Sequence, residues 1–402
     1  MKNKAIFISV CACILLITAI QHVSCSHNEL NLKWQPVTNE TVTTDVTLKV
    51  YMENSGSMDG YMCDSSQLKD AVKSYVSSLD TYVDSINLNY VNSKIIPTNY
   101  NIKQYISTLN PLTFAKAGGN RANSDISEMF EMILNDMKEK EVAMFVSDCI
   151  MDVPEGSSLD FFTDRQIDIR NAFSKHLRND QNTGVEILRL NSKYRGTYFY
   201  YKGSEKLEAE RPYYIFLIGD KRVLAKLNKE VPYTDIKHGV SNYFAYSTAS
   251  EVPFEVTNKF GTSSTKQGVC SSKSNNGTCV FNIKMDLSST LYDDNILCNQ
   301  GNYKTIGSGL TIESVKPISD KKSPYSHVVN ISINDGTKPY GEMLELIALQ
   351  TPSWLETVND ETGKNIKENI GKTTGIKYII GGIADAYKDV ETAATIKFSV
   401  GK

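Results

Sequence analysis

The sequence predicts an α/β domain with a doubly wound, mainly parallel sheet over residues 45–232. A β-rich, sandwich-like domain with late helices follows over 235–402. In the first range, nearly continuous apolar strand segments alternate with amphipathic helical segments, which is typical of a parallel sheet covered by helices. In the second range the segments are short and β-rich, and turns such as Asn334-Asp335-Gly336 follow them, which is typical of antiparallel sandwiches.

The composition limits the function classes. The chain has 402 residues, of which 41% are hydrophobic, so it is long enough for two domains with sizeable cores. The formal net charge is −3, whereas general nucleic-acid-binding proteins are usually basic. We therefore expect no nucleic-acid partner.

Residues 1–24 are expected to be a signal peptide. Lys2 and Lys4 precede an apolar run over 5–20, and Ser24 directly precedes Cys25. This arrangement resembles a bacterial lipobox, in which the cysteine is acylated, although His22 replaces the usual aliphatic residue. The resemblance implies lipid attachment at Cys25; an ordinary cleaved signal peptide or a retained membrane anchor are the alternatives.

The polar segment over 25–44 is expected to be a tether between the membrane and the first domain. We thus expect an exported, membrane-anchored lipoprotein of the cell envelope. The sequence leaves open which side of the membrane it occupies, whether periplasmic or surface-facing on the outer membrane.

Hydrophobic periodicity predicts the elements of the first domain. The helix over 66–79 places Leu68, Val72 and Tyr75 on one face, and the helix that follows the loop at 111–123 can be capped by Ser124 or Asp125. The predicted strands span 46–52, 86–91, 142–146, 185–190 and 213–218, with 197–201 extended, and the remaining predicted helices span 102–109, 164–177 and 221–227.

Short strands and two late helices are predicted for the second domain. The strands span 252–256, 280–285, 310–315, 328–333 and 395–400, and the helical stretches span 353–357 and 376–388. Cys270 and Cys279 flank a polar loop that contains Asn276-Gly277, a strong hairpin signal. We expect these two cysteines to face each other and form a disulfide.

Three segments rich in side-chain oxygens are expected to meet at one edge of the sheet. They are Glu53-Asn54-Ser55-Gly56-Ser57 after the first strand, the loop from Gly118 to Asp125, and Ser147-Asp148 at the end of a later strand. In doubly wound sheets the carboxyl ends of the strands form the ligand site. Hydroxyl and carboxylate oxygens are what a hard cation such as Mg2+ prefers.

These segments resemble the metal-ion-dependent adhesion site of the von Willebrand factor A (vWA) family. The family motif is Asp-x-Ser-x-Ser after the first strand, a Thr before a helix and an Asp ending the fourth strand. Here Glu53, Ser55, Ser57, Ser124 and Asp148 stand at those positions. The resemblance covers about residues 45–230 and implies a Rossmann-like fold.

The resemblance also implies how the site would work. Ser55, Ser57 and Ser124 would bind the cation directly, while Glu53 and Asp148 would orient waters and balance charge. An acidic side chain from a protein partner would fill the open position on the ion. The expected ion is Mg2+, with Mn2+ and Ca2+ left open.

Three residues depart from the family pattern. Glu53 replaces Asp and adds a methylene, Ser124 replaces Thr and lies three residues further from the paired glycines, and Cys149 replaces Gly. Glu53 bears most on the ion, because its longer side chain can move the carboxylate or change the coordination.

The expected function is therefore protein–protein binding or adhesion by the vWA-like domain of an envelope lipoprotein, with no catalytic residue. One alternative is a metal-dependent hydrolase that uses the same oxygens, which would need a general base and further strong ligands. Another is a structural envelope component whose site is vestigial.

Overall fold

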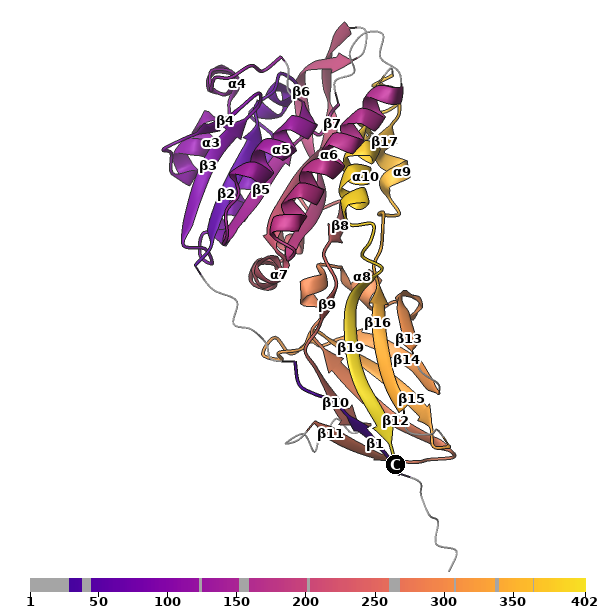
Figure 1. The fold of residues 1–402 in the computed structure, drawn as a ribbon. Coiled ribbons are helices and arrows are strands. Elements are labelled where there is room, and N and C mark those ends of the chain that lie inside the picture. The colour runs from indigo at the N-terminus through magenta and orange to yellow at the C-terminus, as the bar shows by residue number, and fades with distance from the viewer. Residues whose placement is uncertain are drawn as a thin grey trace, which may run out of the picture.

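The computed structural model describes residues 29–37, 45–122, 125–151, 159–200, 203–259, 268–306, 309–336, 340–363 and 365–402. These residues form two units that are joined end to end (Figure 1). The first unit contains a seven-stranded sheet with helices on both faces, and the second contains two smaller sheets.

The large sheet is mixed rather than parallel. Its β2 lies parallel to both β3 and β5, whereas the pairs β3–β4, β5–β7, β6–β7 and β6–β8 are antiparallel. In spatial order its strands are β4 (Ile95–Pro97), β3 (Ser85–Val91), β2 (Thr47–Glu53), β5 (Glu141–Ser147), β7 (Gly203–Asp220), β6 (Thr183–Tyr200) and β8 (Asn242–Tyr246).

The predicted doubly wound, mainly parallel fold class is therefore wrong. Strands account for 38% of the chain and helices for 29%, and antiparallel pairings predominate. The cause is the long hairpin of β6 and β7, whose 18-residue strands pair from Thr183 opposite Asp220 to Tyr200 opposite Gly203.

This hairpin was not evident from the sequence because its outer half carries no apolar run. Residues 203–210 alternate between exposed and half-buried positions, so they read as a polar connection between separate strands. A parallel crossover needs a connection of about a dozen residues or more, usually a helix. Strand β6 ends at Tyr200 and β7 begins at Gly203, so the connection is too short for a crossover helix and the two strands pair antiparallel.

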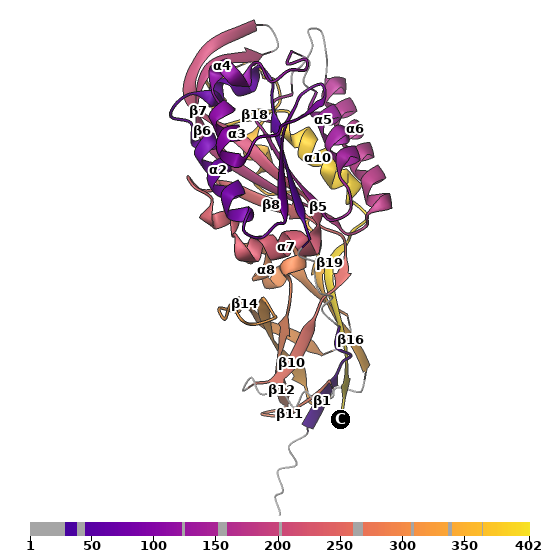
Figure 2. The same cartoon turned by 90° about the vertical axis from the view of Figure 1, so that its left-hand side faces the viewer.

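Helices cover both faces of the large sheet (Figure 2). One face packs against α2 (Gln67–Leu79), α3 (Ile102–Thr108) and α7 (Lys221–Glu230); the other packs against α5 (Ile126–Asp136), α6 (Leu159–Asn179) and α10 (Ile376–Ala386). Successive side chains of a strand point to opposite faces, so Val50 and Met52 lie in the first core and Tyr51 in the second.

The predicted domain boundary does not describe this arrangement. Helix α10, placed by the sequence in the second domain, packs along α6, and Ile376, Ile380 and Ile383 lie in the core of the first unit. A Cβ atom at Gly382 would lie 2.6 Å from the backbone oxygen of Gln166, so the two helices approach closely at this glycine. The first unit thus recruits a late segment of the chain.

The second unit encloses a separate core between two sheets. One sheet has the order β11 (Val269–Lys273), β1 (Glu29–Lys33), β19 (Thr392–Gly401), β16 (Tyr340–Ile347) and β13 (Tyr303–Ile306), with β9 (Ser250–Glu251) also paired to β19. The other has the order β10 (Phe254–Asn258), β12 (Thr278–Met285), β15 (His327–Asn334) and β14 (Leu310–Pro317).

The remaining described elements are short. They are η1 (Ser57–Met62), α4 (Pro111–Phe114), η2 (Tyr233–Asp235), η4 (Ser288–Thr290), α8 (Asp294–Leu297), η5 (Gln300–Asn302), α9 (Leu355–Val358), β17 (Asn359–Asp360) and β18 (Thr373–Thr374). Among the described helices, none has both the length and the hydrophobicity that a bilayer span requires.

Part of the predicted tether is a strand. Residues 29–33 form β1, which pairs with both β11 and β19, and Leu30 and Leu32 are fully buried. The alternation of these two leucines with polar residues is the strand pattern that the tether interpretation overlooked. The predicted signal peptide over 1–24 and the predicted lipid attachment site Cys25 lie outside the described residues.

The predicted disulfide is absent, and Cys270 and Cys279 are free, buried thiols. The turn is tighter than expected, since Asn275 bridges directly to Thr278. The cysteines then belong to different sheets: Cys270 pairs with Leu32 of β1, and Cys279 lies on β12. They are therefore not facing positions of one hairpin.

Candidate functional site

The ends of β2 and β5 lie side by side at the edge of the sheet where the site was expected. The two strands are parallel, with Met52 opposite Val146, so Glu53 and Ser147 end them together. The chain then continues through Ser55 into η1 on one side and through Asp148 on the other. The structure thus places the first and the last of the three predicted segments side by side.

A side-chain hydrogen bond joins the two strand ends. The hydroxyl group of Ser147 donates to Oε2 of Glu53, and the backbone N–H of Cys149 donates to Oγ of Ser147 at 2.7 Å. Cys149 has a φ of 55°, a left-handed conformation that glycine adopts most easily. Cys149 stands where the resembled motif has glycine.

The hydroxyl groups of Ser55 and Ser57 point toward each other. Their oxygens are 2.9 Å apart, and the backbone N–H of Met58 donates to Oγ of Ser55 at 3.4 Å. Ser55 is buried, whereas Ser57 is half-buried. Two of the three predicted direct ligands are therefore adjacent.

Asp148 holds a carboxylate oxygen that has no partner. Its Oδ1 accepts a hydrogen bond from the backbone N–H of Ile150 at 3.1 Å, while its Oδ2 is buried and has no hydrogen-bond partner among the described residues. Burial raises the pKa of Asp148, although the nearby Ser57 hydroxyl and the charge of Arg211 act in the opposite direction. An unpartnered buried acceptor is unfavourable by about 1–3 kcal/mol.

Glu53 is a second buried carboxyl group, only 2% exposed. Burial, followed by the negative charge of Asp148, raises the pKa of Glu53 to about 8, against the hydrogen bonds from Ser147 and Ser55 that lower it. The site alone therefore favours the protonated form of Glu53 more than water does. A positive charge placed between the carboxyl groups would favour ionisation of both.

The donor set fits a hard divalent cation. Two carboxyl groups and two hydroxyl groups meet at this edge, and the unpartnered Oδ2 of Asp148 offers a lone pair in a buried position. Mg2+ prefers such oxygens and tolerates waters in its remaining positions. Among the described residues, no group of three or more His, Cys, Asp or Glu side chains forms a metal site, so hydroxyl groups would have to complete this one.

The third predicted segment also reaches the site, through a residue that the sequence did not single out. Arg121 donates from Nη2 to the backbone oxygen of Ser55 at 2.8 Å and forms an ion pair with Asp59. Asn92 donates to the backbone oxygen of Gly118 at 2.8 Å and holds the start of the loop. The predicted ligand Ser124 lies outside the described residues.

Arg211 is the second residue that the sequence analysis missed. It is 1% exposed, and its Nη1 donates to the backbone oxygens of Ile370 and Lys372 at 2.6 and 3.0 Å. Its Nε and Nη2 have no hydrogen-bond partner in the described part of the chain, and its guanidinium lies 4.9 Å from the ring centre of Tyr198. A single arginine before a predicted apolar strand is not part of a recognisable motif, so the sequence did not indicate its role.

The outer half of the β6–β7 hairpin covers η1 and so covers one side of the site. The ring of Tyr61 meets that of Tyr194 edge to face at 5.1 Å, and the Tyr61 hydroxyl donates to the backbone oxygen of Pro212 at 2.5 Å. A Cβ atom at Gly60 would lie 2.2 Å from the ring of Tyr194, so only glycine fits beneath the hairpin. Ser57, which is half-buried, is the least buried of the four predicted site residues that the structure describes.

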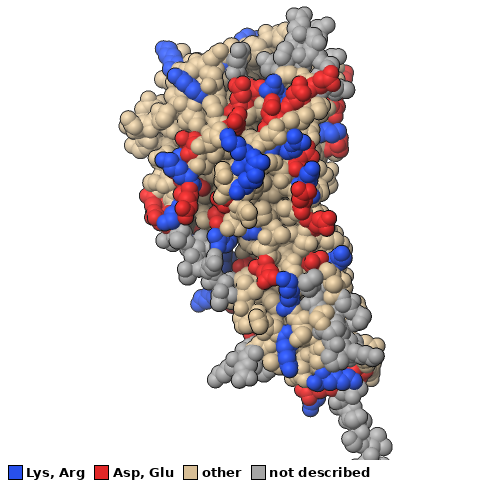
Figure 3. All heavy atoms as spheres, viewed as in Figure 1, with Lys and Arg blue, Asp and Glu red and all other residues tan. Residues whose placement is uncertain are grey.

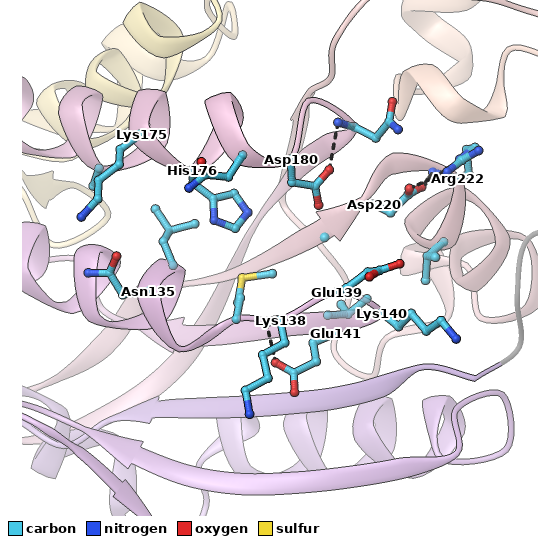
Figure 4. A pocket seen from close by; sticks show the side chains of 18 of the residues that line it. Asn135, Lys138, Glu139, Lys140, Glu141, Lys175, His176, Asp180, Asp220 and Arg222 are labelled. Carbon is cyan, nitrogen blue, oxygen red and sulfur yellow. Dashed lines mark hydrogen bonds and ion pairs between the residues drawn. The ribbon is translucent and has the colours of Figure 1, made fainter.

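A cavity of about 710 Å3 lies at the opposite edge of the same sheet (Figure 4). Its lining includes Lys140 and Glu141 at the start of β5, His176 of α6, Asp220 at the end of β7 and Arg222 of α7. Many of its charges are already paired, as in the 2.9 Å contact between Arg222 and Asp220. This cavity shares no residue with the predicted site. Its lining contains both acidic and basic side chains, so it does not favour a ligand of one charge.

The comparisons with known proteins leave the family undetermined: no family model matches this chain, and no curated protein matches it. The likeness to the metal-ion-dependent adhesion site is therefore carried by the site residues alone.

Proposed function

We propose that this chain is an exported cell-envelope lipoprotein that binds a protein partner through a divalent cation held at the ends of β2 and β5. The observation that carries the proposal is the unpartnered, buried Oδ2 of Asp148 beside the second buried carboxyl group of Glu53. A cation bound between the two carboxyl groups would give the unpartnered acceptor a partner and would favour the ionised form of both groups.

The site residues would have different roles in binding the ion. The hydroxyl groups of Ser55, Ser57 and Ser124 would hold the ion, and Glu53 and Asp148 would balance its charge. When bound, the ion supplies an open coordination position that attracts a carboxylate. The partner is therefore a protein that offers an Asp or Glu side chain, and no bond is made or broken.

The buried position supports this role. Electrostatic attraction is stronger where water is excluded, so a partner carboxylate that reaches the ion from the side of Ser57 would bind in a low-dielectric environment. Arg121 and Asp59 lie at the same side as a neutralised pair. Because their charges cancel, this pair would weaken the attraction between the ion and a partner carboxylate little.

A vestigial site in a structural envelope component is the second candidate, and Arg211 favours it. Its buried charge already lowers the pKa of Asp148, which is part of what a cation would do. In this case Arg211 would stabilise the acidic cluster permanently, and no ion would be needed.

Isothermal titration calorimetry of the full chain in detergent distinguishes the two candidates. Mg2+, Mn2+ and Ca2+ are each titrated into the wild type, into Ser55→Ala/Ser57→Ala and into the control Ser77→Ala/Ser78→Ala, whose exposed serines lie on α2. We expect heat from the wild type and the control, and little from the site variant. No heat from the wild type, or equal heat from all three, would overturn the cation proposal.

The open position can be tested with bound Mn2+ as the probe. The ion enhances the relaxation of water protons that exchange through its coordination shell. A short peptide that contains Asp should displace this water and lower the enhancement, whereas the same peptide with Asn should not. Equal effects of the two peptides would contradict recruitment of a carboxylate.

A further inference from the structure

We infer that the molecule is a stalk with a head, in which the membrane-anchored end of the chain and the candidate site lie at opposite ends. The inference rests on the proposed lipid anchor at Cys25 but not on cation binding. It specifies the partner as one that approaches from the side away from the anchoring membrane.

The candidate site lies at one edge of the large sheet. Strand β5 runs antiparallel to β7, with Ala143 opposite Ile218 and Ser147 opposite Tyr214. The site follows Ser147 at the carboxyl end of β5. The carboxyl end of β7, and Lys221 after it, therefore lie at the other edge of the sheet.

The second unit is attached at that other edge. Nζ of Lys221 donates to the backbone oxygen of Thr248 at 2.8 Å, and the hydroxyl of Tyr243 donates to the backbone oxygen of Leu291 at 2.5 Å. A Cβ atom at Gly184, near the start of β6, would lie 2.6 Å from a methyl group of Leu291. The junction between the two units therefore lies at the edge of the large sheet that is remote from the site.

The junction is also crossed repeatedly by the chain. Described backbone passes between the units after β8, after β16 and after α10. The indole N–H of Trp354 donates to the backbone oxygen of Tyr243, and the hydroxyl of Tyr292 accepts from the N–H of Leu349 at 2.9 Å. Several connections, with hydrogen bonds among them, restrict bending more than a single flexible linker would.

The beginning of β1 lies at the free end of the second unit. Glu29 is opposite Lys273, next to the turn between β11 and β12, and Asn31 is opposite Gly401 at the carboxyl end of β19. The other end of β19 pairs with β9 beside the junction, with Thr395 opposite Glu251. Strand β19 thus spans the unit from junction to free end.

The distances follow from chain geometry. Three residues lie between Cys25 and Glu29, so the four Cα–Cα steps between them reach at most about 14 Å when fully extended. The ten residues of β19 span roughly 34 Å and the seven of β5 roughly 23 Å. Because the units are joined end to end (Figures 1 and 2), the site lies on the order of 50 Å beyond the free end of the stalk.

The surface agrees with a partner that meets the head rather than the membrane. In Figure 3 positive and negative side chains are interspersed over the visible face, and acidic ones gather toward the upper end, which belongs to the first unit. A lipid surface with anionic headgroups would favour a basic face. The occupant that fits is a soluble protein, or a protein displayed on a facing surface.

Energy transfer from a site-specific fluorophore to a lipid acceptor tests the orientation. The acylated chain is incorporated into vesicles through the lipid on Cys25. Single azide-bearing residues, coupled to the fluorophore, replace Lys273 at the free end, Ile347 near the junction, or Leu112 on α4 beside η1. Ile347 and Leu112 are 38% and 77% exposed.

We expect transfer to fall several-fold from position 273 to position 112, with position 347 between them. Equal transfer, or the reverse order, would overturn the inference. Failure of the wild type to bind vesicles, or equal binding by Cys25→Ala, would overturn it as well, because the anchor would be absent. Calorimetry with Mg2+ on the same samples tests the cation separately, so the two failures are distinguishable.

Discussion

The hydroxyl group of Ser147 donates to the carboxyl group of Glu53, so the ends of the central parallel strands β2 and β5 are joined through their side chains. This bond holds Glu53 buried and close to Asp148, whose Oδ2 has no partner among the described residues. The arrangement is unfavourable for two ionised carboxyl groups and favourable for a cation between them. The first two predictions concern this relationship.

Glu53→Gln should weaken cation binding while leaving the fold intact. Glutamine can still accept the Ser147 hydrogen bond, but it supplies no charge to the ion. We expect at least a tenfold loss of Mg2+ affinity by calorimetry and an unfolding temperature close to that of the wild type. Glu53→Asp, which keeps the charge, is the matched variant and should bind. Unchanged affinity in Glu53→Gln would show that this carboxyl group does not serve the ion.

Arg211→Met should destabilise the protein and tighten cation binding. The variant loses the hydrogen bonds to the backbone oxygens of Ile370 and Lys372, which we expect to lower the free energy of unfolding by about 2–4 kcal/mol. It also removes a positive charge that opposes the ion. Urea unfolding and calorimetry measure the two effects, and Arg211→Lys is the control that keeps the charge. Weaker binding in Arg211→Met than in Arg211→Lys would contradict the expected repulsion.

Glu186→Gln should flatten the dependence of stability on pH. Glu186 is 1% exposed, and burial raises its pKa to about 8 in the folded chain, despite the hydrogen bond that its Oε1 accepts from Asn228. Between its unfolded value near 4.5 and about 8 the folded state holds a proton that the unfolded state has released. The contribution of Glu186 is therefore present at low pH and is lost as pH rises, by up to about 1.4 kcal/mol per pH unit.

Urea unfolding between pH 5 and 8 checks this prediction. The wild type should lose more stability across the interval than Glu186→Gln, because glutamine does not ionise. Glu230→Gln, at an exposed position of α7, is the control and should follow the wild type. Parallel curves for the wild type and Glu186→Gln would refute a raised pKa at this position.

Gly60→Ala should loosen the outer half of the β6–β7 hairpin. The added methyl group would lie 2.2 Å from the ring of Tyr194, so the hairpin must shift, at a cost of about 1–3 kcal/mol. We expect a lower free energy of unfolding and faster proteolytic cleavage of the hairpin. Gly341→Ala meets no atom within 4 Å and should leave both unchanged. Equal stability of the two variants would mean that the hairpin does not pack on η1.

Leu32→Ala should lower the free energy of unfolding as much as a substitution in a hydrophobic core does. Leu32 is fully buried in the core of the second unit, so we expect a loss of about 2–5 kcal/mol in urea unfolding. The exposed neighbour Lys33 provides the control Lys33→Ala, which should change stability little. A loss below about 0.5 kcal/mol for Leu32→Ala would indicate that residues 29–33 behave as the tether that the sequence suggested.

Local pattern predicted many elements well. The predicted helix over 66–79 is α2 (Gln67–Leu79), whose buried side chains recur at helical spacing. The predicted strands over 86–91 and 142–146 are β3 and β5, each of which contains a run of consecutive buried residues. The order in which strands pair is decided by distant contacts, and there the sequence analysis failed. Nothing local in residues 191–212 indicates that β6 turns directly back into β7.

The same limit applies to the late helix and to the site. The apolar face of α10 predicts a buried helix but not which sheet it covers, and it covers the first unit. The oxygen-rich strand ends around Glu53 and Asp148 were predicted because they follow recognisable strands. Arg211 and Arg121 reach the site from distant positions as single residues, and no spacing in the sequence marks them.

The pairing of β1 has a mechanical consequence. If a partner bound at the head pulls against an acyl group on Cys25, the tension enters the protein at Glu29 and runs along the axis of β1. Strands β11 and β19 flank β1, with Glu29 to Lys33 in register with Lys273 to Val269 on one side. Such a load shears the hydrogen bonds together instead of peeling them one at a time. Strand β1 is thus placed to resist being pulled out of the second unit.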